Sequence, residues 1–177
     1  LFQSLSHKKI IYETKMSRHE VYISYAWGGE SEIIVTEICR QLQNNKVKYY
    51  IDKKDIAYKD SIREFEERLG AGDYVILVVS DKFLKSKDCM YEFLQIKNAG
   101  NIYERIFPIV LEDAKIYDPN DRIYYIKYWE EKVKELDENI KTISPAYLSG
   151  LRDDIDNYTE YRKIIPEITA LLSRMNT

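Results

Sequence analysis

The sequence contains few of the residue types on which reactive sites most often depend. Among its 177 residues there are two cysteines and two histidines, which excludes a disulfide framework and a zinc site. His7 and His19 both precede the first predicted strand, so neither a Ser-His-Asp nor a Cys-His mechanism has a base. If the protein is an enzyme, we expect it to work mainly with a carboxylate.

Glycine is also scarce, with six residues in the chain. Gly28-Gly29 and Gly70-Ala-Gly72 fit neither the Gly-x-Gly-x-x-Gly fingerprint of dinucleotide-binding folds nor the Walker loop. The Gly-x-Ser-x-Gly nucleophile elbow is missing too. These absences argue against a classical dinucleotide fold, a P-loop NTPase and a serine hydrolase of the elbow type.

Long apolar runs are absent, so we predict no membrane span, and no signal peptide is visible. A net charge of −3 does not indicate direct binding of nucleic acid. Together with the isolated cysteines, these features predict a reduced, cytoplasmic setting. The 45% apolar content and the length of 177 residues are typical of one soluble globular domain.

The chain divides into a short extension and one predicted domain. Leu1-Phe-Gln-Ser4 is typical of the remnant of a protease-cleavable tag, so we assign residues 1–16 to a tag remnant or linker. Residues 17–177 are predicted to form a single domain. Apolar runs at 20–25, 47–51, 74–79 and 106–111 predict strands, and amphipathic patterns at about 31–44, 61–69, 88–99, 129–140 and 164–175 predict helices.

Alternation of strands and helices predicts βαβ units and therefore an α/β fold with a parallel sheet. The run at 74–79 is apolar throughout, which is typical of a strand buried on both faces. Pro108 favours a position at the sheet edge or a strand end. Within the polar segment 112–127, Asp118-Pro-Asn-Asp121 predicts a turn, and Pro166 is expected in the first turn of the last helix or at a kink.

Candidate site residues follow the strands, because ligands bind at the carboxyl edge of open α/β sheets. Glu92 lies on the helix after the third strand, where helical geometry places it at the border of an apolar stripe of Cys89, Phe93 and Ile96. On this geometry alone, an ordinary helix glutamate that interacts with the helix dipole is the favoured interpretation.

The other strand ends offer weaker candidates. Trp27, beside two glycines after the first strand, could stack on a flat ring or simply flank the core in a turn. Asp52 ends the second strand, where aspartate is commonly a turn former. Cys89 lies near a helix N-terminus, which activates some thiols, although a buried inert cysteine is more common.

Over about residues 17–111, several segments resemble the conserved boxes of the Toll/interleukin-1 receptor (TIR) domain and occur in the same order along the chain. Details such as Ser24-Tyr-Ala-Trp27 and Cys89-Met-Tyr-Glu92 look bacterial. The matching segments are Val21-Tyr-Ile-Ser-Tyr25, Val47-Lys-Tyr-Tyr-Ile-Asp52 with Asp55-Ile and Ser61-Ile, Tyr74-Val-Ile-Leu-Val-Val-Ser80 with Phe83-Leu, Ser86, Cys89 and Glu92, and Ile106-Phe-Pro-Ile109.

The resemblance implies a flavodoxin-like open sheet of about five parallel strands with helices on both faces. Many bacterial and plant members, and one animal member, cleave the nicotinamide–ribose bond of NAD⁺ with an essential glutamate, which by position is Glu92. NAD⁺ is then a substrate, and no cofactor or metal is implied. The residues expected to bind it are Ser24, Tyr25, Ala26, Trp27, Asp52, Ser80 and Cys89.

The resemblance also implies partners and an alternative. The family self-associates through TIR–TIR contacts, and a sensor domain in a longer protein is expected for an effector of bacterial defence. A non-catalytic module that signals through TIR–TIR contacts stays open as the second hypothesis. This chain departs from the family in having Asp88 where some members have tryptophan, and Ala26-Trp27 where some enzymes place basic residues.

Overall fold

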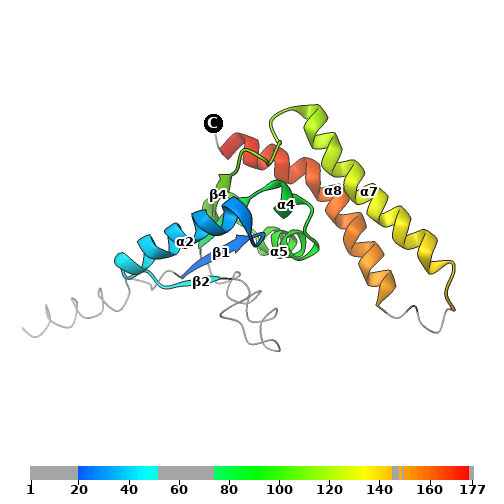
Figure 1. Cartoon of the computed structure of the whole chain (residues 1–177), viewed down its shortest axis with the longest axis horizontal. Helices are drawn as coiled ribbons and strands as arrows, with labels where there is room; N and C mark the ends of the chain where they lie inside the picture. Colours follow the sequence, from blue (N-terminus) through cyan, green and yellow to red (C-terminus); the bar gives the residue numbers. More distant parts are fainter. Residues whose placement is uncertain (1–19, 52–73, 145–147, 149, 176–177) are drawn as a thin grey trace, which may run out of the picture.

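A computed structural model describes residues 20–51, 74–144, 148 and 150–175. The predicted helix at 61–69, Asp52 and the loop that follows it lie outside the described residues, as do both histidines. The described part contains one parallel sheet with helices on both of its faces (Figure 1). This arrangement confirms the predicted α/β class.

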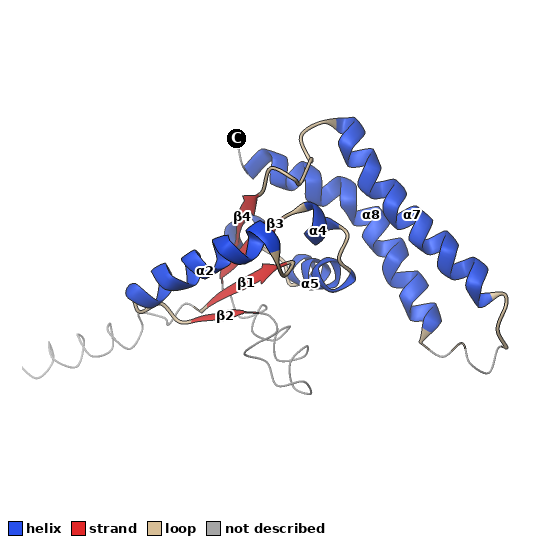
Figure 2. Cartoon of the chain, viewed as in Figure 1, coloured by secondary structure: helices blue, strands red, loops and turns tan. Residues whose placement is uncertain are grey.

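Four strands form the sheet in the order β2-β1-β3-β4, so that β1 and β3 are central (Figure 2). All three strand pairs are parallel. The strands are β1 (Val21–Tyr25), β2 (Tyr49–Ile51), β3 (Tyr74–Val79) and β4 (Ile106–Val110). The expected number of about five is one too high for the described residues, because the chain enters a pair of long helices after β4.

The helices differ in length and in the layer they form. Two short ones, α4 (Asp81–Leu84) and α6 (Ile102–Arg105), flank the helix that carries Glu92. The longer helices are α2 (Gly29–Asn44), α5 (Lys87–Asn98), α7 (Pro119–Ile140) and α8 (Leu151–Met175). The longest two, α7 and α8, lie side by side beyond α5 (Figure 1).

Alternation along β1 and β3 divides the core into two halves. Ile23 and Val78 face the α2 side, where Ile34 and Ile38 of that helix pack against them. Leu77 is one of the strand residues on the other side, in the cluster that also contains buried residues of α5, α7 and α8. The prediction that the third strand is buried on both faces is therefore confirmed.

Two helices, α7 and α8, begin earlier in the sequence than predicted. The segment predicted as a turn is the start of α7: Asp118 is its N-cap, accepting a hydrogen bond from the Asn120 N–H at 2.7 Å, and Pro119 occupies the first turn. Helix α8 begins at Leu151, so Pro166 lies inside it and not in its first turn. The early part of α8 has few aliphatic residues, and it packs through tyrosines against Trp129 of α7.

Strand β4 forms one edge of the sheet, as the proline in it predicts. The Leu111 N–H donates to the Val79 carbonyl at 2.9 Å. By the alternation of a parallel ladder, residues 106, 108 and 110 therefore direct their nitrogens to the outer edge. Pro108 has no N–H, and the Ile106 N–H donates to the Ile102 carbonyl within the chain's own α6 turn.

Candidate active site

Glu92 is held at the carboxyl end of β1 by a direct hydrogen bond. Its helix α5 starts at the N-cap Ser86, whose hydroxyl accepts from the Cys89 N–H at 3.3 Å. Glu92 is 8% exposed and borders the buried stripe as predicted. The Ser24 hydroxyl, on β1, donates to Glu92 Oε2 over 2.7 Å, and both side chains are buried.

The hydrogen bond from Ser24 lowers the free-energy cost of burying the Glu92 carboxylate. Removing an ionised carboxylate from water is unfavourable unless donors satisfy its oxygens, and a hydroxyl forms a strong hydrogen bond to a charged acceptor. The bond links the sheet to α5, so the carboxylate has a defined position relative to the β1 end. The site therefore offers one buried carboxylate in a fixed position, in the part of the fold where α/β proteins bind ligands.

The loop from β1 to α2 lies at the same end of the sheet. Ala26 is buried, whereas the Trp27 side chain is 42% exposed. Gly28 has φ +91° and ψ 169°, a conformation that is accessible almost only to glycine, and its N–H donates to Glu32 at 3.4 Å. The exposed tryptophan can therefore take part in ligand stacking or in a protein contact, and the loop backbone is fixed beneath it.

Other predicted residues have structural partners away from Glu92. Tyr25 is buried on the opposite face of the sheet, where its hydroxyl donates to Glu32 at 3.2 Å. Ser80 is the N-cap of α4 and accepts from the Phe83 N–H at 3.1 Å. Cys89 is buried in the core and is not part of a disulfide. The structure thus brings Ser24 to Glu92, and a role in substrate binding stays a prediction for Ser24 and for the other residues.

Sequence reasoning missed Lys82. It lies in α4, two residues after Ser80, and its Nζ donates to the Trp27 carbonyl at 2.5 Å. A signal was present in the sequence: the first loop lacks basic residues, and a lysine follows the end of the neighbouring strand almost at once. Strand order is needed to see that these two segments meet at one edge.

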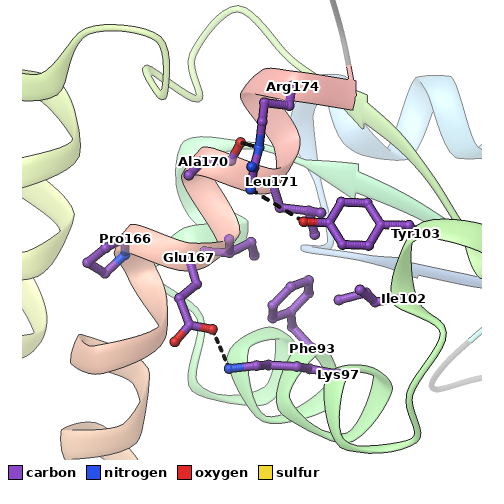
Figure 3. Close-up of a pocket in the computed structure, with 10 residues that line it drawn as sticks. Phe93, Lys97, Ile102, Tyr103, Pro166, Glu167, Ala170, Leu171 and Arg174 are labelled. Carbon is purple, nitrogen blue, oxygen red and sulfur yellow. Dashed lines mark hydrogen bonds and ion pairs between the residues drawn. The ribbon is translucent and has the colours of Figure 1, made fainter.

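Two cavities lie away from Glu92. An apolar groove of about 470 Å³ lies between α5, α6 and α8, with an ion pair between Lys97 and Glu167 on its rim and a 3.3 Å hydrogen bond from Arg174 to the Tyr103 hydroxyl (Figure 3). It contains none of the predicted site residues. A smaller, acidic cavity of about 460 Å³ is lined by Asp81, Asp113, Lys115, Asp121, Tyr124 and Tyr125.

Neither cavity indicates a metal centre. Within the described ranges, no group of three or more histidine, cysteine, aspartate or glutamate side chains is arranged to hold a metal ion. Among the same residues, no helix has both the length and the apolar character needed to cross a bilayer. Burial, followed by the charge of Asp81, raises the pKa of Tyr125 in the acidic cavity, so this phenol stays protonated at neutral pH.

Comparison with known proteins gives a family and a fold. A model of the TIR domain family matches residues 21–144. Among solved structures, the chain is similar to the TIR domains of the activated Roq1 resistosome that directly recognises the pathogen effector XopQ, with a TM-score of 0.54 and 18% identity. That match covers 85% of this chain and 84% of the other, and at this identity it shows the fold alone. No curated protein sequence matches the chain.

Proposed function

The chain belongs to the TIR domain family, and from this premise we propose that it is an NAD⁺ glycohydrolase. It cleaves the nicotinamide–ribose bond and releases nicotinamide, with ADP-ribose or a cyclic ADP-ribose as the second product. The observation that carries this proposal is the buried Glu92 carboxylate, fixed by the Ser24 hydroxyl at 2.7 Å beside the β1 end.

A single carboxylate is sufficient for this chemistry. The bond between ribose C1′ and the pyridinium nitrogen breaks with both electrons going to nitrogen, so nicotinamide leaves as a neutral molecule without a general acid. The ribose becomes an oxocarbenium-like cation in the transition state, and a nearby fixed anion stabilises that charge. Water then attacks C1′ and loses a proton, which gives ADP-ribose; attack by an adenine nitrogen gives the cyclic product.

The other residues at this edge have supporting roles in the proposal. Ser24 keeps the carboxylate in one orientation through a buried hydrogen bond, so little reorganisation is needed during the reaction. Trp27 exposes its ring beside the loop glycines, where it can stack on a flat nucleobase or nicotinamide ring. NAD⁺ is the substrate in this scheme, and no resident cofactor takes part.

We also propose that the domain acts as a cytoplasmic effector in bacterial defence or signalling and is activated when copies associate. The similarity to TIR domains of a resistosome supports association between copies. The same similarity favours an alternative, in which the domain is a non-catalytic module that signals by TIR–TIR contacts. This alternative predicts no turnover at any protein concentration.

The deciding experiment measures nicotinamide release from NAD⁺ by dilute, concentrated and bead-clustered protein. We expect turnover that rises steeply with clustering. Glu92→Gln should lower turnover by about 100-fold or more, the scale of losing one electrostatic stabiliser of a transition state. Glu104→Gln, a change at an exposed glutamate of α6, is the matched control and should leave turnover unchanged.

Two results would count against the proposal. Full turnover by pure, folded Glu92→Gln protein would exclude the role given to this carboxylate. A clustered wild-type protein without turnover would favour the interaction module.

A further inference from the structure

Lys82 places a positive charge directly on the loop that leaves β1. Its Nζ donates to the Trp27 carbonyl at 2.5 Å. The same Nζ lies 3.9 Å from the position that a Cβ on Gly28 would occupy. Lys82 belongs to α4, which follows β3, and β3 is the strand next to β1 in the sheet. The positive charge at the β1 loop therefore comes from the segment that follows the neighbouring strand.

This lysine differs in its partners from the lysine that caps α4 and from the lysines of α5. Lys85 forms an ion pair with Asp81 at 2.8 Å, and Lys87 and Lys97 pair with Asp154 and Glu167 of α8. Within the described part of the chain, Lys82 has no carboxylate partner, and its side chain is exposed. An ammonium group has three donors, and one of them is used by a neutral carbonyl, so the charge itself is not compensated.

The proposed substrate needs such a charge. A dinucleotide carries a diphosphate, while the side chains nearest this loop in sequence, Glu30 and Glu32, are acidic and Glu92 adds a buried carboxylate. Residues 24–31 contain no lysine or arginine. A cation for the diphosphate must therefore come from another element, and α4 provides one at the edge of the sheet to which Glu92 is fixed.

We infer that Lys82 binds the diphosphate of the dinucleotide at the sheet edge where Glu92 lies. This inference rests on the proposed NAD⁺ cleavage. It makes Lys82 a specificity-determining residue, which favours dinucleotides over nicotinamide nucleosides that lack phosphate. Because this contact is made equally in the bound substrate and in the transition state, its loss should raise KM and leave kcat nearly unchanged.

The test uses Lys82→Gln in the whole chain. Glutamine keeps an N–H donor for the Trp27 carbonyl but removes the charge, so the variant separates phosphate binding from loop positioning. We expect the KM for NAD⁺ to rise by about 10-fold or more, the scale of a charge-assisted hydrogen bond. Cleavage of nicotinamide riboside should be unchanged. Lys87→Gln is the matched control, and Lys82→Arg should restore most of the affinity.

Direct binding of ADP-ribose, measured by calorimetry, provides a readout that needs no turnover. A wild-type protein that binds ADP-ribose at least 10 times more tightly than Lys82→Gln supports the inference, even if NAD⁺ is not cleaved and the proposed reaction fails. Cleavage of NAD⁺ with equal KM and equal ADP-ribose affinity in both proteins overturns the inference alone. Parallel loss of NAD⁺ and riboside cleavage overturns it in favour of a structural role, and absence of both binding and cleavage overturns both proposals.

Discussion

Replacing Ser24 by alanine removes the hydroxyl that donates to Glu92 and changes nothing else in the chain. The bond is 2.7 Å long, and Ser24 and Glu92 are 1% and 8% exposed. Hydrogen bonds to charged groups contribute about 1.5–3 kcal/mol, at the upper end when water cannot replace the lost donor. The space left by one oxygen atom is smaller than a water molecule, so we expect no substitution by solvent.

The expected loss in the free energy of unfolding is therefore about 1.5–3 kcal/mol. For a chain of this size the loss corresponds to a fall in Tm of about 3–12 °C. Urea unfolding followed by circular dichroism measures the free energy directly. The control is Thr36→Ala, which removes a hydroxyl bond of the same length, 2.7 Å, from an exposed position on α2. Its cost should stay below about 0.5 kcal/mol.

A double-mutant cycle then isolates the interaction. Ser24→Ala, Glu92→Ala and the combined variant should show a coupling energy of about 0.5–3 kcal/mol, as expected for side chains in direct contact. If Ser24→Ala costs no more than Thr36→Ala, and the coupling is zero, the bond does not fix the carboxylate. In that case the reasoning that assigns Glu92 a preorganised position is refuted, whatever the enzyme assay shows.

Three further predictions concern the fold. Tyr161→Phe removes a buried hydroxyl with no hydrogen-bond partner among the described residues, so stability should stay constant or rise by about 1 kcal/mol, as urea unfolding will show. Burial raises the pKa of Tyr161 and Tyr125, so folding favours the neutral phenols; their contribution to stability should be fully present below pH about 10 and be lost above it, with a shallower loss in Tyr161→Phe. Gly28→Ala, at φ +91°, should cost about 1–3 kcal/mol in the same assay, and more than Gly29→Ala at φ +62°; an equal cost would contradict the backbone argument.

The position of Glu92 follows from local sequence, but its partner does not. The spacing of Cys89, Phe93 and Ile96 specifies which residues border the buried stripe, because the geometry of a single helix determines it. Ser24 lies 68 residues earlier, and which strand residue meets Glu92 depends on how α5 packs on the sheet. The likeness to a family places both residues at one edge without specifying a bond between them.

The boundaries of α7 and α8 show a second limit of prediction from the sequence. Asp118-Pro119 is compatible with a turn and also with an N-cap followed by a first-turn proline. Which of the two forms depends on whether the following residues pack as a helix in the folded protein. The first half of α8 lacks an aliphatic stripe, so periodicity finds the helix only from Ile164 onward. Tyr158 and Tyr161 pack against the ring of Trp129, which belongs to another helix, so the sequence of α8 alone does not reveal their role in packing.

The proline in β4 has a consequence for how copies of this protein can meet. A regular parallel edge offers a donor at every second residue, but here Pro108 has none and the Ile106 N–H is already bonded, which leaves Val110. An incoming strand would find few donors, so growth of a continuous sheet from this edge is disfavoured. We therefore expect association on this side to depend mainly on side chains, and a common route to fibrous aggregation is disfavoured.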